Sequence, residues 1–224
     1  MRFSLPENWP STPDEARDMQ VRLAPQIREC PLSVRPRTLA GVDVAYDDAT
    51  DTVIAAVTMH DAETLAITEK AIASDALAFP YMSGLFSFRE IPPVLKALNQ
   101  LDTLPDILIC DGHGRAHPRR IGLASHLGLL VGLPSIGCAK THLFGKYLPP
   151  GETRGDHAPI THEGEIIGAV LRTQTGVNPV YVSVGHLITL SEAIEIILAA
   201  APDYRLPETT RAADQAVRRA MSGR

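Results

Sequence analysis

Three strand-like runs joined by very short links constrain the fold of this chain more than any other feature. They cover residues 39–45, 52–60 and 64–73, and each is apolar or alternates apolar with polar residues. Because links this short join antiparallel neighbours, the three runs are predicted to form a meander. A purely parallel, doubly wound sheet would not begin with tight hairpins, so this opening disfavours that architecture.

The pattern changes in the second half of the chain. Residues 107–110 form a continuous apolar run, as expected of a central strand buried on both faces. A helical pattern over residues 120–131 and a short buried strand over residues 134–139 follow, and this order favours a parallel crossover. We therefore expect one α/β domain over residues 1–224, with a ribonuclease H-like mixed sheet (an antiparallel three-strand meander plus parallel strands) flanked by helices.

The remaining segments complete this prediction. A short amphipathic helix is expected within residues 14–27, packed outside the core, and a second helix over about residues 88–101. Pro92 and Pro93 fit only the first turn of a helix, so its regular part is predicted to begin near them. Residues 159–173 and 179–184 suggest a hairpin or edge region, and helices are expected at residues 191–200 and 207–221.

Composition narrows the class of protein. The chain carries 21 Lys and Arg against 26 Asp and Glu, a net charge of −5, and is 45% hydrophobic, which excludes a disordered chain. No apolar run is long enough for a membrane span or a signal peptide, so no membrane partner is expected. Three cysteines make no disulfide framework, and the predicted location is the cytoplasm.

One segment departs from this acidic balance. Between Asp111 and Lys146 the only carboxylate is Asp111 itself, and five lysines and arginines surround it. Its stretch Asp111-Gly112-His113-Gly114 lacks the GxGxxG spacing of a dinucleotide-binding loop. It offers backbone N–H groups and cationic side chains, which suit phosphates or a base edge.

Three acidic residues occupy positions where a charge is expensive. Asp43 lies inside an apolar strand, where an unanswered carboxylate costs several kcal/mol, although a side chain turned to solvent would explain it equally well. Asp111 ends a buried strand before a glycine-rich turn, a common site position in α/β sheets, with a turn-forming role as the alternative. Glu90, near a helix start, would by itself be an ordinary solvated helix residue.

The combination is more informative than each acid alone. If the first strand lies parallel to the 107–110 strand, Asp43 and Asp111 project together at one sheet edge, and Glu90 completes an all-oxygen cluster. Such a cluster suits Mg²⁺, with Mn²⁺ as a substitute, rather than zinc. A zinc site from Cys110, His113 and His117 is disfavoured, because Cys110 should face the opposite side of its strand from Asp111.

At these residues the sequence resembles the endonuclease V family, the deoxyinosine 3′ endonucleases. The resemblance runs in order over nearly the whole chain after about the first thirty residues. It is carried by GVDVAY at 41–46, PYMSGLFSFRE at 80–90, DGHG at 111–114, HPRRIG at 117–122, SIGCAK at 135–140, YVSVGH at 181–186 and YRLPETTR at 204–211.

The resemblance implies a DNA repair endonuclease that hydrolyses the second phosphodiester bond 3′ to deoxyinosine, leaving 3′-hydroxyl and 5′-phosphate ends. The implied chemistry is in-line attack by a metal-activated water. The implied catalytic residues are Asp43, Glu90, Asp111 and Lys140, the first three as metal ligands and Asp214 as an outer ligand. Lys140 would contact the scissile phosphate or orient the water, and a strand-end lysine in solvent is its alternative.

The resemblance also implies a substrate-binding set. Tyr81, Met82, Ser83 and Gly84 match a wedge that fills the gap left by a displaced base. Backbone groups around Gly84, Leu85, Gly112 and Gly122 would read hypoxanthine, and Gly114, His117 and Arg119 complete the set, with a structural role equally open for His117. His113 is assigned no role. The implied partner is inosine-containing DNA, with inosine in RNA as a second candidate, bound by a monomer.

Two other functions remain open at this stage. The fold could serve a structure-specific nuclease without base preference, or a non-catalytic reader of damaged or structured nucleic acid. The intact set Asp43, Glu90, Asp111 and Lys140 argues against the reader. A nucleotide-binding oxidoreductase is a distant further alternative.

Overall fold

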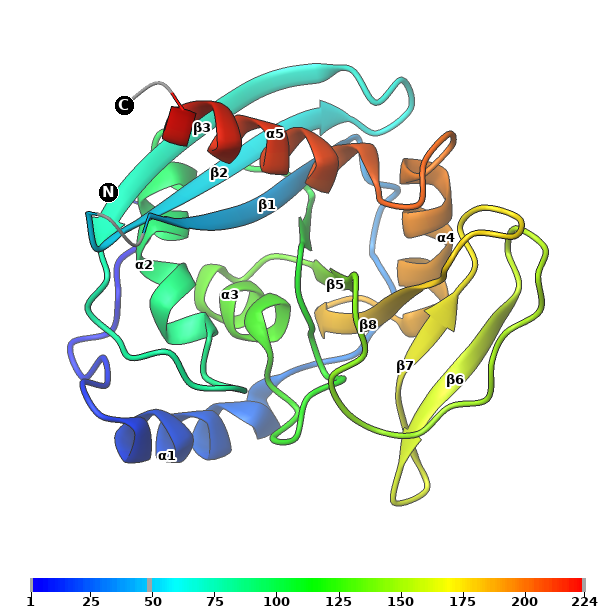
Figure 1. Ribbon diagram of the computed structural model, residues 1–224, viewed down its shortest axis with the longest axis horizontal. Helices are drawn as coiled ribbons and strands as arrows, with labels where there is room; N and C mark the ends of the chain where they lie inside the picture. The colour runs from blue at the N-terminus through cyan, green and yellow to red at the C-terminus, as the bar shows by residue number, and fades with distance from the viewer. Residues whose placement is uncertain (1, 48–49, 223–224) are drawn as a thin grey trace.

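The computed structural model describes residues 2–47 and 50–222 (Figure 1). Within these residues the strands form one eight-stranded mixed sheet, in the order β3-β2-β1-β4-β5-β8-β7-β6. Helices cover both of its faces. The fold is the expected ribonuclease H-like arrangement of a meander followed by parallel strands.

The opening meander is confirmed. Strands β1 (Thr38–Asp47), β2 (Thr52–Asp61) and β3 (Ile67–Ala76) pair antiparallel in sequence order. The third strand begins three residues later than the pattern suggested, because the Asp61 side chain forms a turn. Its carboxylate accepts the backbone N–H groups of Glu63 and Thr64 at 3.1 and 2.8 Å, which ends β2 and delays β3.

The predicted parallel crossover is also confirmed. Strand β4 (Ile107–Cys110) pairs parallel with β1 and with β5 (Ser135–Ala139), and helix α3 (Leu123–Val131) connects β4 to β5. The helix begins later than the expected residue 120. Arg120 has a φ of 61°, a left-handed conformation that cannot belong to a helix.

The C-terminal strands form a second meander. Strands β6 (His157–His162) and β7 (Glu165–Leu171) make the expected hairpin, and β8 (Val180–His186) pairs antiparallel with both β7 and β5. Strand β8 is therefore an interior strand, and β6 forms the edge of the sheet. This arrangement places the start of β8 beside the end of β5, where Tyr181 pairs with Ala139.

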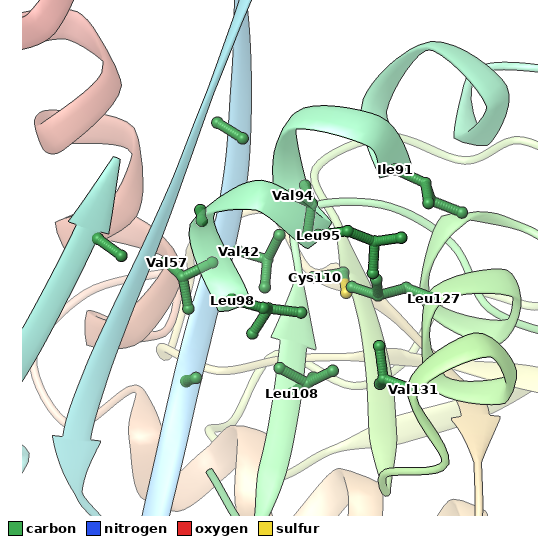
Figure 2. Close-up of a cluster of buried hydrophobic side chains, with 14 of the residues drawn as sticks. Val42, Val57, Ile91, Val94, Leu95, Leu98, Leu108, Cys110, Leu127 and Val131 are labelled. Atoms are coloured by element: carbon green, nitrogen blue, oxygen red, sulfur yellow. The ribbon is translucent and has the colours of Figure 1, made fainter. Parts of the chain in front are cut away.

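The core lies on both faces of the sheet. Leu108 and Cys110 of β4 face helices α2 (Ser87–Leu98) and α3, as Figure 2 shows. Ile107 and Ile109 face the opposite side, in the cluster that includes helix α4 (Leu190–Ala200). This alternation confirms that β4 is buried on both faces.

The expected start of α2 near residue 88 is confirmed, but the prediction that its regular part begins near Pro92 is wrong. The helix begins at Ser87, and Pro92 and Pro93 lie inside it rather than in its first turn. Each proline removes one backbone donor. The apolar side chains of this segment, among them Ile91 and Leu95, bury against the sheet and against α3 (Figure 2), and this packing offsets the lost hydrogen bonds.

Helices α5 (Glu208–Ser222) and α1 (Pro13–Leu23) pack on this framework. Helix α5 crosses β1 at Gly41, where an added Cβ would lie 2.0 Å from the Thr209 carbonyl oxygen. Helix α1, continued by the short 3₁₀ helix η1 (Ala24–Gln26), packs on Leu85 and Phe88. Among the described residues, none of the helices has the length and apolar character that a membrane crossing needs.

Candidate active site

Asp43 lies within β1, and Asp111 directly follows β4, the parallel neighbour of β1 in the centre of the sheet. Val42 pairs with Cys110, and the Asp111 backbone N–H donates to the Val42 carbonyl oxygen at 3.0 Å. The register therefore brings the next residue of each strand, Asp43 and Asp111, alongside one another. The expected site required that the strands carrying Asp43 and Asp111 be parallel neighbours, and β1 and β4 are.

The two carboxylates interact electrostatically. Burial, and then the negative charge of Asp111, raise the pKa of Asp43 to about 7. Lys140 acts in the opposite direction, whereas Asp214 adds a smaller repulsion. A carboxylate with such a raised pKa lies in a region with too little positive charge, which a cation would supply.

Glu90 reaches the cluster from the first turn of α2. Its Oε1 accepts a hydrogen bond from the Tyr46 hydroxyl at 2.6 Å. Burial is the main reason why the pKa of Glu90 rises to about 7, and the Asp111 charge adds to it. Asp111 thus interacts with Asp43 on one side and with Glu90 on the other, so it is the central acid of the group.

Lys140 follows directly after β5 and pairs with Asp111 through Nζ and Oδ2. Burial opposes its charged form, but the hydrogen bond and the charge of Asp111, together with Asp43 and Asp214, raise the pKa of Lys140 overall. The side chain is 40% exposed, so its ammonium group is within reach of a ligand in solvent. Lys140 is thus not a strand-end lysine in solvent, because it joins the acidic cluster.

Asp214 belongs to α5 and lies at the periphery. Its Oδ2 accepts a salt bridge from Arg218 Nε at 2.9 Å, and its charge acts on both Asp43 and Lys140. The side chain is 29% exposed. This placement suits an outer position better than a central one.

The donor set fits a hard divalent cation. It consists of the carboxylate oxygens of Asp43, Glu90 and Asp111, and these negative charges outnumber the nearby positive ones. Lys140 beside them is partly exposed, so the cluster is accessible from solvent. Across residues 2–47 and 50–222, no three His, Cys, Asp or Glu side chains are already grouped closely enough to be read as a formed metal site. The ammonium of Lys140 stands beside Asp111 where an ion would otherwise balance its charge.

The zinc alternative fails in the structure. Cys110 is buried among Val94, Leu95 and other apolar side chains, between β4 and the helices α2 and α3 (Figure 2). Burial raises the pKa of the Cys110 thiol far above its ordinary value, which disfavours the thiolate that zinc requires.

A cavity of about 180 Å³ adjoins the acidic cluster. Its lining includes Glu90 and Asp111 together with glycines of both predicted binding loops, namely Gly84, Gly112 and Gly122. Gln20, His113, His117 and His142 also line it. Two of the acids, Glu90 and Asp111, are therefore part of the cavity wall.

The predicted wedge residues lie on a loop before α2. The Tyr81 side chain is 72% exposed; its ring centroid lies 5.0 Å from that of Phe86, and the Arg89 guanidinium lies 5.7 Å from the same ring. Ser83 is also exposed, whereas Met82 is partly buried against the cluster of α1. Tyr81 thus projects from the loop rather than packing as a core residue.

Other residues of the predicted substrate-binding set have structural partners. Leu85 is buried in the cluster under α1, and the Gly114 N–H donates to Ser183 Oγ at 2.8 Å. His117 Nε2 and Arg119 Nη2 both lie 3.0 Å from the Gly84 carbonyl oxygen. His117 therefore braces the loop in this structure, which was one of the two roles considered for it.

Two residues of the site carry no clear signal in the sequence. Tyr46 holds Glu90 across 44 positions of the chain, and Gln20 of α1 contacts both loops around the cavity. A strand tyrosine and a helix glutamine are ordinary by type and spacing. The motif around Asp43 contains Tyr46, but nothing in it identifies Glu90 as the partner.

Known relatives match the chain over nearly its full length. Residues 20–215 match the profile of the Endonuclease V family. The Endonuclease V of Streptomyces avermitilis is 49% identical over 219 residues, covering 97% of this chain and 96% of the relative. That of Roseiflexus castenholzii is 49% identical over 214 residues, covering 96% of each chain.

Solved structures agree with these matches. The crystal structure of Endonuclease V from Streptomyces avermitilis superposes with a TM-score of 0.93 at 48% identity, covering 98% of this chain and 97% of that one. The catalytic domain of human Endonuclease V gives 0.87 at 28% identity, covering 97% of each chain. Ciona intestinalis Endonuclease V in complex with a 24mer DNA containing an inosine followed by a ribo-adenosine gives 0.83 at 25% identity, covering 94% and 98%. The chain belongs to the endonuclease V family and is a nuclease of that family.

Proposed function

We propose that this enzyme cleaves DNA at the second phosphodiester bond 3′ to deoxyinosine, leaving 3′-hydroxyl and 5′-phosphate ends. The observation that carries the proposal is the joint placement of Asp43, Glu90 and Asp111 beside a cavity of about 180 Å³. The relative from Ciona intestinalis was crystallised with inosine-containing DNA, which supports the same substrate class here.

Asp43, Glu90 and Asp111 would hold Mg²⁺ or Mn²⁺, with Asp214 as an outer ligand. A bound divalent ion supplies Lewis-acid stabilisation of a phosphoryl oxygen and lowers the pKa of water. The acids are suited to this task because the pKa values of Asp43 and Glu90, both about 7, fall when positive charge is placed among them.

The protein itself supplies orientation and charge. Lys140 keeps its proton, because the acids around it raise its pKa, and its ammonium group can donate to a non-bridging oxygen of the scissile phosphate. Tyr46 holds Oε1 of Glu90 in place. These contacts fix the acids before the nucleic acid arrives, which reduces the reorganisation needed for hydrolysis.

Base recognition is assigned to the cavity and to Tyr81. A base reaches an enclosed pocket only after it leaves the stack, at a cost of a few kcal/mol that is smaller for a mispaired base. The exposed ring of Tyr81 can stack in its place. Gly84, Gly112 and Gly122 line the cavity, and backbone groups of these loops other than the Gly84 carbonyl can pair with the O6 and N1–H of hypoxanthine and leave adenine unsatisfied.

The nuclease of the same fold without base preference is the second candidate, and inosine in RNA is the second substrate. The enzyme is proposed to act as a monomer, and its proposed location is the cytoplasm. The decisive test compares a single-inosine DNA duplex, a matched normal duplex and a single-inosine RNA with Mg²⁺ or with EDTA. Inosine-dependent nicking of the DNA that EDTA abolishes is expected. Equal nicking of the normal duplex, or binding without nicking, would contradict the proposal.

A further inference from the structure

The side chain of Gln20 lies between the two loops that line the cavity. It is 1% exposed, and its Nε2 lies 3.0 Å from the Gly84 carbonyl oxygen and 3.3 Å from the Ile121 carbonyl oxygen. Gly84 belongs to the loop that carries Tyr81, and Ile121 to the loop that follows Asp111. One amide group of α1 therefore connects both walls of the cavity.

The Gly84 carbonyl oxygen accepts from three side chains at once. Gln20 Nε2, His117 Nε2 and Arg119 Nη2 each lie 3.0 Å from it. A carbonyl oxygen has two lone pairs, so three donors exceed its ordinary complement. Arg119 Nε also donates to Gln20 Oε1, so both ends of the Gln20 amide are engaged.

The local backbone explains how this carbonyl becomes available. Gly84 has a φ of 77°, a left-handed conformation that favours glycine. A Cβ at this position would lie 3.0 Å from Arg119 Nη2 and 3.3 Å from His117 Nε2, so the donors approach as closely as only glycine allows. The turn that follows Tyr81 is thereby fixed to the cavity wall.

We infer that Gln20 is a positioning residue that holds the Tyr81 loop against the cavity before nucleic acid binds. This inference rests on the proposed function and adds a residue to it. Gln20 acts through the carbonyl groups of Gly84 and Ile121 rather than on the reacting atoms. A loop that is already ordered loses less conformational freedom on binding, so Gln20 contributes to affinity and to base selection rather than to the hydrolytic step.

The test replaces Gln20 by methionine, which has a similar length and no donor, and by glutamate, which places an oxygen opposite both carbonyls. Gln26→Met is the matched control, because Gln26 is exposed and donates only to the Arg22 carbonyl. Hydrogen exchange of the free protein reports loop order, since the Leu85 N–H donates to the Met82 carbonyl at 3.0 Å. Single-turnover cleavage of a single-inosine duplex gives the half-saturating enzyme concentration and the maximal rate.

For Gln20→Met we expect about tenfold faster exchange at residues 81–86 and about tenfold weaker half-saturation, with the maximal rate unchanged within about twofold. Gln20→Glu should give larger changes in the same direction, and Gln26→Met none. Unchanged exchange at residues 81–86 would overturn the inference, as would faster exchange spread evenly over the chain. Failure of the wild-type enzyme to act on inosine would overturn the proposed function alone, because the exchange experiment contains no nucleic acid.

Discussion

Asp43 of β1 lies alongside Asp111, which follows the end of the parallel strand β4, and the charge of Asp111 contributes to raising the pKa of Asp43 to about 7. The ordinary pKa of an aspartic acid is 3.8. Because folding raises the pKa of Asp43, this residue binds its proton more tightly in the folded state than in the unfolded state. Its contribution to stability is present below pH 3.8 and is lost as the pH rises through about 7.

Asp43→Asn should therefore stabilise the metal-free protein at neutral pH while abolishing cleavage. The free energy of unfolding changes by about 1.4 kcal/mol for each unit by which the pKa values of Asp43 in the folded and unfolded states differ. Urea unfolding at pH 5, 6, 7 and 8, with EDTA, measures it. The free energy of unfolding of the wild type should fall relative to the variant as pH rises. Parallel pH profiles for the two proteins, or nicking by Asp43→Asn at the wild-type rate, would contradict this assignment.

Tyr46→Phe should weaken metal binding without removing a ligand. The hydroxyl of Tyr46 donates to Glu90 Oε1 at 2.6 Å, and groups that orient metal ligands typically contribute about 10–100-fold in affinity or activity. The Mn²⁺ affinity measured by calorimetry should fall by about tenfold or more. Tyr147→Phe is the control, because it also removes a hydroxyl, which pairs with that of Tyr181 at 3.0 Å. Equal Mn²⁺ affinity in both variants would show that Tyr46 does not position Glu90.

Tyr81→Ala should reduce selection for inosine more than it affects the metal site. The ring is 72% exposed, and stacking on a base is worth about 1–3 kcal/mol. We expect the ratio of kcat/KM for inosine and normal duplexes to fall by about tenfold, with Mn²⁺ affinity unchanged. Tyr81→Phe keeps the ring and should retain the ratio. A loss of the same size in Tyr81→Phe would mean that the hydroxyl, not stacking, is responsible.

His126 gives a stability prediction away from the active site. It is completely buried, and burial lowers its pKa to about 3, so only the unfolded chain takes up a proton between about pH 6.5 and 3. Stability is therefore lost as the pH falls, by about 2 kcal/mol at pH 5 for this one group. His126→Leu should flatten the acid side of the stability profile by that amount.

The fluorescence of Trp9 reports on the surroundings of His126. Trp9 is the chain's single tryptophan, and its ring stacks on His126 with centroids 5.4 Å apart. Urea unfolding followed by Trp9 fluorescence at pH 7, 6 and 5 compares the two proteins. A variant that loses as much stability on acidification as the wild type would contradict the role given to His126.

The sequence was sufficient for the sheet and for the central acids, because both depend on local patterns. Asp43 and Asp111 were expected together if the strand of residues 39–45 lay parallel to the 107–110 strand, and the register confirms that pairing. The prediction that the regular part of α2 begins near Pro92 and Pro93 was wrong, because residue type alone does not include the packing that keeps both prolines inside the helix.

Contacts between residues far apart in the sequence could not be predicted in this way. The bonds from Tyr46 to Glu90 and from Gln20 to Gly84 join residues 44 and 64 positions apart. They depend on where α1 and α2 pack, and neither periodicity nor residue type specifies that packing. The family resemblance supplied the candidate roles, but not the partners that hold those residues in place.

Whether Asp111 binds a divalent cation is tested most directly by a Mn²⁺ titration of the free protein, followed by electron paramagnetic resonance. Wild type, Asp111→Asn and the exposed control Glu63→Gln are compared under identical conditions. We expect wild type and Glu63→Gln to bind Mn²⁺ alike and Asp111→Asn to lose this binding. Identical titrations for all three proteins would contradict a cation site built on Asp111.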